Sequence, residues 1–187
     1  MDVYECIRTR RTVREFKPDP VPDAIVHKIL RAGRWAPSSS NTQPWHFVVV
    51  RNRETLGAIG RIATQGTFIG QAPLAIAIVM ENAGRPQLDA GRALQQMELM
   101  AWSEGLGTCF VGLRAAEQQH AIKALLGIPE EMELITVLPF GYRLAERRAG
   151  GTPRKPMAEI AHSEKFGTAY IPHLGLGVDR HPGTTDI

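Results

Sequence analysis

A polar loop between two prolines constrains this chain more than any other stretch. Residues 37–44 read Pro-Ser-Ser-Ser-Asn-Thr-Gln-Pro and lead into the apolar run 48–50. Each proline fixes its own φ and keeps the residue before it out of the helical region. The six polar side chains between the prolines can offer donors and acceptors to a flat polar ligand. They can equally satisfy local backbone groups in an ordinary turn before a strand, which the loop alone favours.

The segments around this loop alternate between helical and strand patterns. Apolar residues recur at helical spacing in residues 2–9, 23–33, 53–64, 89–104 and 115–126. Apolar runs bounded by Gly or Pro predict strands at 46–50, 74–80, within 105–112 and at 132–140. Residues 157–166 are expected to form a short helical or extended arm.

On the residues alone, this alternation favours a parallel α/β sheet, although spacing does not specify strand order. The 187 residues show no internal repeat and no domain linker. They therefore predict one domain at 1–170 and a Gly/Pro-rich C-terminal tail at 171–187.

Composition limits where the protein is expected to work. No apolar run approaches the roughly 20 residues of a membrane-spanning helix, and no secretory signal is visible at the N-terminus. The two cysteines, Cys6 and Cys109, show no CxxC or metal spacing. Both are expected to be reduced. These features predict a cytoplasmic protein without a membrane partner.

The basic residues indicate a compact anion rather than an extended one. The net charge is +3, and the basic residues are dispersed except for clusters at 8–14 and 143–155. No basic stripe interleaved with aromatic residues is present, so we expect no nucleic-acid partner. Two clusters far apart in sequence fit one buried phosphate, while the ordinary alternative is a solvated surface patch.

No familiar arrangement of nucleophile, metal ligand or nucleotide loop is present. The six histidines are scattered without HxxxH or Cys pairing, so no metal site is expected. A Walker loop and a nucleophile elbow are also missing. The Gly-Leu-Gly at 105–107 is typical of a helix C-cap rather than a phosphate cradle. Such a chain suits a cofactor that performs the chemistry itself, so no catalytic side chain is assigned.

Two motifs, in order, resemble the nitroreductase family of flavin enzymes. Residues 10–16, Arg-Arg-Thr-Val-Arg-Glu-Phe, are similar to the family run Arg-Arg-Ser/Thr-x-Arg-x-Phe. Residues 36–47 are similar to its loop Ala-Pro-Ser-x-x-Asn-x-Gln-Pro-Trp-x-Phe. The resemblance covers roughly residues 1–167. It implies an α+β sandwich with a mixed central β-sheet flanked by helices, built as an intertwined homodimer with FMN sites at the subunit interface.

The resemblance implies that the basic run and the polar loop hold FMN from different subunits. Arg10, Arg11 and Thr12 match positions that hold the phosphate and ribityl chain, and Arg14 matches the position at the pyrimidine edge of the ring. The loop residues expected to reach the flavin of the partner subunit are Pro37, Ser38, Ser39, Asn41 and Gln43. For Gln43, a role in bracing the loop is an equal alternative.

Three further segments carry residues that the resemblance assigns to the cofactor. Gln65 precedes a loop that presents a polar group to the flavin pyrimidine. The backbone of Phe110, Val111 and Gly112 is expected under the ring, where an N–H can donate to flavin N5. Arg154 and Lys155 match a basic pair that closes the phosphate site. Thr152 stands where many members carry an additional lysine.

The implied activity is an FMN-dependent oxidoreductase. It would take a hydride from NADH or NADPH and reduce a nitroaromatic, a quinone or a similar small acceptor by a ping-pong mechanism. An oxygen-using branch of the same fold, which fragments flavin or dehalogenates a substrate, is an alternative. A basic binding module without flavin is a second alternative, from a different class of function.

Overall fold

The computed structural model describes residues 1–82, 84–144 and 153–170. The chain forms two compact units, Met1–Gly150 and Gly151–Ile187. The expected boundary after residue 170 therefore falls inside the second unit. The expected tail, 171–187, lies outside the described residues.

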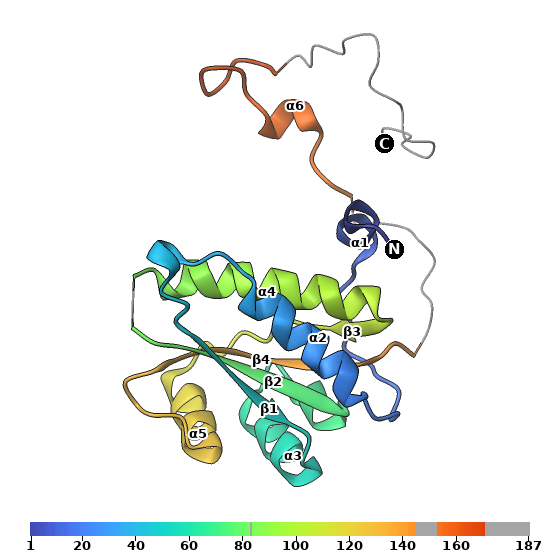
Figure 1. Cartoon of the computed structure of the whole chain (residues 1–187), viewed down its shortest axis with the longest axis vertical. Helices are drawn as coiled ribbons and strands as arrows, with labels where there is room; N and C mark the ends of the chain where they lie inside the picture. Colours follow the sequence, from blue (N-terminus) through green and yellow to red (C-terminus); the bar gives the residue numbers. More distant parts are fainter. Residues whose placement is uncertain (83, 145–152, 171–187) are drawn as a thin grey trace. The chain divides into compact units, whose positions relative to one another are not determined.

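The first unit contains helices and strands close to the predicted ranges (Figure 1). The helices are α1 (Val3–Thr9), α2 (Asp23–Arg34), α3 (Arg53–Ile62), α4 (Pro86–Ser103) and α5 (Ala116–Leu126). The strands are β1 (Trp45–Val50), β2 (Leu74–Met80), β3 (Leu106–Thr108) and β4 (Glu133–Tyr142). Short 3₁₀ turns, η1 (Ser39–Asn41) and η2 (Thr67–Gln71), lie in two of the connections.

Local chemistry explains several helix ends. The Asp2 carboxylate accepts the N–H of Glu5 at 2.7 Å and caps α1, and Asn52 caps α3 through the N–H of Thr55 at 2.9 Å. Helix α5 ends at Gly127, whose φ of 66° lies in the left-handed region that glycine adopts without a steric penalty.

The four strands pair in the order β1-β2-β4-β3, and each of the three pairings is antiparallel. Neither the parallel sheet favoured by the residues alone nor the mixed sheet implied by the resemblance describes these strands. Among residues 1–82, 84–144 and 153–170, parallel pairing is restricted to a single bridge between Thr12 and Thr108. Strand β3 is also shorter than predicted, since residues 109–112 are not part of a strand.

The sheet separates two apolar cores because side chains along a strand alternate between its faces. On β2, Leu74, Ile76 and Ile78 pack with residues of α2 and α4. Ala75 and Ala77 pack on the opposite side with residues of α3 and α5. Figure 1 shows the same layers, with α2 and α4 over one face of the sheet and α3 and α5 over the other. Among the described residues, no helix is long and apolar enough to cross a bilayer.

The second unit is described by itself. It contains the short helix α6 (Met157–Ile160) within the predicted arm. An antiparallel bridge pairs His162 with Ala169, and the rings of His162 and Phe166 lie 4.5 Å apart. Arg154 and Lys155 belong to this unit, where both are exposed.

Candidate functional site

The basic run lies along the edge of the sheet at β3. The N–H of Val13 donates to the carbonyl of Thr108 at 2.9 Å, next to the bridge between Thr12 and Thr108. A Cβ at Gly107 would lie 2.5 Å from the Cβ of Val13, so only glycine permits this close approach. The predicted residues 10–14 are thereby placed beside the strand that leads into residues 109–112.

Arg10 is paired with a buried carboxylate on α4. Its Nη1 lies 3.5 Å from Oε2 of Glu98. Burial raises the pKa of Glu98, and the charge of Arg10 acts in the opposite direction. Arg10 therefore lies beside a buried carboxyl group while its own side chain remains partly accessible to an anion.

Arg14 joins two loops. Its guanidinium carbon lies 6.0 Å from the centre of the Phe68 ring, close enough for a cation–π interaction. It also lies against the thiol of Cys109. Burial raises the pKa of that thiol, and Arg14 partly offsets the effect. Arg14 is consequently a cation held between the loop after α3 and the segment after β3.

These two loops pack tightly against each other. A Cβ at Gly66 would lie 2.5 Å from Cγ1 of Val111. Gln65, the predicted site residue next to Gly66, is exposed. The structure thus brings the Gln65 loop, residues 109–112 and Arg14 together within the first unit.

A buried threonine on β4 fixes the backbone of residues 109–112. The hydroxyl of Thr136 donates to the carbonyl of Val111 at 2.9 Å and accepts its N–H at 3.3 Å. The N–H of Val111 is therefore already used. Over the described parts of the chain, the N–H of Gly112 donates to no group. Of these two amides, Gly112 is the one available to a ligand.

Arg11 and Thr12 make local contacts through one guanidinium nitrogen and through the backbone, respectively. Nη1 of Arg11 donates to the carbonyls of Arg8 at 3.0 Å and Arg10 at 2.9 Å, which braces the chain as it leaves α1. Thr12 contributes its backbone to the bridge with Thr108.

The hydroxyl oxygen of Thr108 is buried and has no hydrogen-bond partner among the described residues. A buried polar atom of this kind is normally satisfied by a ligand or by water.

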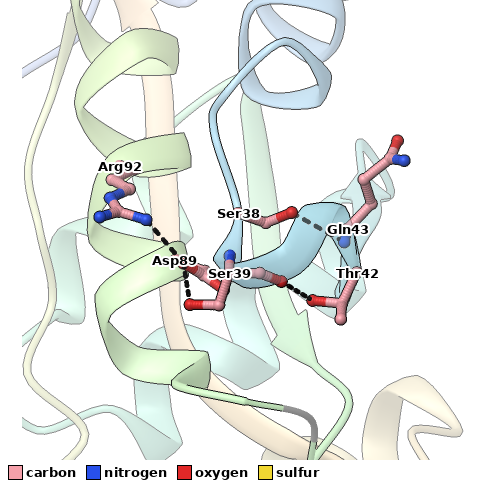
Figure 2. Close-up of polar contacts among 6 residues, drawn as sticks. All are labelled: Ser38, Ser39, Thr42, Gln43, Asp89 and Arg92. Atoms are coloured by element: carbon pink, nitrogen blue, oxygen red, sulfur yellow. Dashed lines mark hydrogen bonds and ion pairs between the residues drawn. The ribbon is translucent and has the colours of Figure 1, made fainter.

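The polar loop is held by its own hydrogen bonds and by α4 (Figure 2). The N–H of Gln43 donates to Oγ of Ser38 at 2.9 Å, and Oγ1 of Thr42 donates to the carbonyl of Ser39 at 3.0 Å. Ser39 faces Asp89 on α4, to which its N–H donates at 3.0 Å. Pro37 is exposed.

Three loop residues, Ser40, Asn41 and Gln43, have φ values of 52°, 56° and 50°. This left-handed conformation is costly for residues other than glycine and persists where the surroundings impose it. Beside the loop lies a hollow of about 360 Å³. Its lining residues are Arg34, Trp35, Ala36, Asn41 and Gln43.

The polar loop and the basic run contact α4 at positions that are well separated along the helix axis. Asp89 contacts the loop, whereas Glu98, nine residues further along, contacts Arg10. At 1.5 Å per residue, these two positions are roughly 13.5 Å apart along the helix axis. Within one chain, the structure therefore does not place the loop beside Arg10.

Sequence reasoning missed Asp89, Glu98 and Thr136. A signal for the first two was present, because Glu98 follows Leu94 by four residues and Asp89 precedes Ala93 by four. These spacings put both carboxylates on the apolar face of the helix. A charge on such a face needs a partner. Thr136 gave no signal, because threonine is common in strands.

The donors gathered at the β3 edge suit an anionic, flat, amide-rich ligand. Arg10 and Arg14 supply positive charge, and the N–H of Gly112 supplies a backbone donor. Gly66 and Gly107 keep the surrounding segments close together. This set fits FMN, which carries a phosphate and a flat ring with polar edges.

Comparisons with known proteins agree with this geometry. The profile of the nitroreductase family matches residues 7–84 and 64–142. A Methanothermobacter thermautotrophicus protein named as an NADH dehydrogenase/NAD(P)H nitroreductase is 37% identical over 148 residues, which span 76% of this chain and 78% of that protein. A protein of the same name from Archaeoglobus fulgidus is 33% identical over 176 residues, spanning 87% of this chain and 99% of that one.

Solved structures show the same fold. The FMN-dependent nitroreductase of Clostridium difficile R20291 superposes with a TM-score of 0.79 at 27% identity, covering 87% of this chain and 99% of that one. Iodotyrosine deiodinases are more distant relatives. That of Daphnia pulex is 26% identical over 194 residues, spanning 85% of this chain and 65% of that protein.

Proposed function

Because this chain belongs to the nitroreductase family and is an NAD(P)H nitroreductase-like oxidoreductase, we propose that it binds FMN and uses NADH or NADPH to reduce a small acceptor. A nitroaromatic or a quinone is the acceptor class that we favour. The proposal rests on one observation: at the β3 edge, Arg14, the loop at Gly66 and residues 109–112 contact one another. These are segments that the motifs assigned to one cofactor.

In this proposal the protein binds and orients rather than reacts. FMN, when bound, supplies the centre that accepts a hydride from the nicotinamide and passes electrons to the acceptor. Arg10, Arg11 and Thr12 would hold the phosphate and ribityl chain. From their match to the basic pair of the family, Arg154 and Lys155 would also bind a phosphate. Arg14 would place positive charge at the pyrimidine edge and favour the reduced, anionic state.

The N–H of Gly112 would donate to the ring, because Thr136 already occupies the N–H of Val111. Of the three expected residues, 110–112, this argument removes only the N–H of Val111, and Gly112 is the donor that we favour. The Thr136 hydroxyl holds this backbone in place before a ligand arrives, which lowers the entropy that binding has to overcome.

We further propose a homodimer in which the polar loop serves the flavin of the partner subunit. The separation of Asp89 and Glu98 along α4 supports this arrangement, since one chain does not bring the loop to its own basic run. Helix α1 also leaves Val3, Tyr4 and Ile7 more than half exposed, at 72%, 59% and 56%. An apolar face of this kind suits burial against a second copy.

A second candidate function is supported by the deiodinase relatives. It is an oxygen-using or dehalogenating activity on the same cofactor. The basic binding module without flavin accounts less well for the site, because it assigns no role to the packing of Gly66 against Val111.

Steady-state kinetics test the proposed reaction. Initial rates with NADPH against a nitroaromatic or a quinone should give parallel double-reciprocal lines, as a ping-pong cycle requires. Intersecting lines would overturn the mechanism. Turnover confined to an iodinated or brominated phenol, with halide released, would favour the dehalogenating alternative.

A further inference from the structure

The carboxylate of Asp89 ties the polar loop to α4. Asp89 lies in the first turn of α4 and has no exposed surface. Its Oδ2 accepts the N–H of Ser39 at 3.0 Å, and its Oδ1 accepts the hydroxyl of Ser39 at 3.4 Å. Nη1 of Arg92 donates to Oδ1 at 3.0 Å. Figure 2 shows these contacts on one side of the loop.

A buried carboxylate depends on such partners. An ionised group removed from water is costly unless it is paired and hydrogen-bonded. Here one partner is Arg92 and the other is Ser39, through its backbone and its hydroxyl. The loop conformation and the burial of Asp89 therefore stabilise each other.

The anchored residue controls the rest of the loop. Ser39 is the first residue of η1, and its carbonyl accepts the hydroxyl of Thr42. After Ser39, three residues of the loop, Ser40, Asn41 and Gln43, have left-handed backbone conformations. Such a conformation persists only where contacts outside the segment impose it. Within the described residues, the hydrogen bonds from side chains of α4 to this loop come from Asp89.

We propose that Asp89 is a positioning residue that holds residues 38–43 in their flavin-binding conformation before FMN arrives. This inference rests on the proposed function of the loop. Asp89 acts through Ser39 and does not itself touch the cofactor. Its effect is preorganisation: a loop that is already ordered loses less entropy on binding.

The test uses the full-length protein and three variants. Asp89→Asn keeps the size of the side chain but removes its charge. Arg92→Gln removes only the second partner of the carboxylate, from a side chain that is 41% exposed. Glu104→Gln is the control, because it removes a carboxylate at the other end of α4, where the partner is Lys28 at 2.8 Å. The measurements are FMN affinity, amide hydrogen exchange of residues 39–43 without FMN, the visible circular dichroism of bound flavin, and the unfolding temperature.

For Asp89→Asn we expect the FMN dissociation constant to rise at least about tenfold, the loss typical of a charge-assisted hydrogen bond. Exchange at residues 39–43 should accelerate, and the visible circular dichroism of the bound flavin should change at saturation. Arg92→Gln should show smaller changes in the same direction. Glu104→Gln should match the wild type. A purely structural role would lower the unfolding temperature without altering the flavin signal of the folded protein.

Wild-type FMN affinity together with wild-type exchange in Asp89→Asn would overturn the inference. If that variant does not fold, the same two readouts on Arg92→Gln decide. Failure of the wild-type protein to bind FMN is a different result. It would overturn the proposed function, while the exchange measurement would still decide whether Asp89 orders the loop.

Discussion

Nη1 of Arg10 lies 3.5 Å from Oε2 of Glu98, whose side chain is only 11% exposed. The first arginine of the basic run is thus oriented by a carboxylate that the protein has buried. An anion that reaches Arg10 meets a guanidinium that is already fixed in place. This relationship links the core of α4 to the proposed phosphate site.

Replacing Arg10 tests that site. Arg10→Ala should weaken FMN binding by about 1–3 kcal/mol, the range for a hydrogen bond to a charged group. Equilibrium titration of the folded apoprotein with FMN measures this loss. The control is Arg8→Ala, which replaces an exposed arginine two residues earlier in the chain and should bind FMN like the wild type. Equal affinities for both variants and the wild type would remove Arg10 from the phosphate site.

Glu98 should make stability depend on pH. Burial raises its folded pKa above the ordinary value of 4.5. The folded state therefore binds the proton more tightly than the unfolded chain does. Its contribution to stability is fully present below about pH 4.5 and is lost as pH rises through the folded pKa.

Glu98→Gln removes this dependence. The unfolding free energy of the variant relative to the wild type should increase as pH rises from 4.5 through the folded pKa. Urea unfolding of both apoproteins over a pH series measures the difference. A constant difference, or one that decreases with pH, would contradict the assignment of Glu98 as a buried carboxyl with a raised pKa.

Thr136 should stabilise the segment after β3. Thr136→Val keeps the shape of the side chain but leaves the N–H and carbonyl of Val111 without their partner. Unsatisfied buried polar groups cost about 1–3 kcal/mol, so urea unfolding should show a loss of that size. Thr136→Ser retains the hydroxyl and should lose much less stability. Equal losses in the two variants would mean that the methyl group, not the hydrogen bonds, stabilises the segment.

The contact between Gly66 and Val111 should appear in a double-mutant cycle. Gly66→Ala puts a methyl group 2.5 Å from Cγ1 of Val111, and overpacking of this kind typically costs about 1–3 kcal/mol. Val111→Ala removes the obstructing methyl groups. The double variant should therefore be more stable than the sum of the single changes predicts. Additive losses would show that the two loops do not press on each other.

The local pattern of the chain predicted much of the fold. The apolar run after Pro73 became β2 with the predicted bounds, because a continuous buried run bounded by proline has few alternatives. The start of α4 was missed by three residues. Its first turn contains Pro86, which suits the first position of a helix because the missing N–H has no intrahelical partner there.

Contacts between distant segments were harder to predict. Strand direction depends on packing that spacing does not encode, so the antiparallel sheet was not anticipated. Residues 109–112 looked like a strand from their composition. The Thr136 side chain binds both backbone groups of Val111 instead, and in the part of the chain that the structure describes no strand pairs with residues 109–112.

The candidate site also contains residues that sequence motifs predicted and residues whose roles depend on contacts between distant segments. Arg14 and the loops at Gly66 and Val111 were assigned by motif, and the structure brings them together. For Asp89 and Glu98, the sequence pattern predicts only that they lie in a helix. Their importance arises from partners 50 and 88 residues away in sequence, Ser39 and Arg10. The predicted roles of Arg154 and Lys155 stay predictions.

One measurement tests the central claim most directly. Purified protein is mixed with FMN, freed of unbound cofactor by gel filtration, and its visible spectrum is recorded under nitrogen before and after NADH or NADPH is added. The account predicts a retained two-banded flavin spectrum that is bleached by at least one of the two nicotinamides. A protein that emerges without a flavin band would contradict the assignment of an FMN site. A retained band that neither nicotinamide bleaches would contradict the proposed oxidoreductase activity.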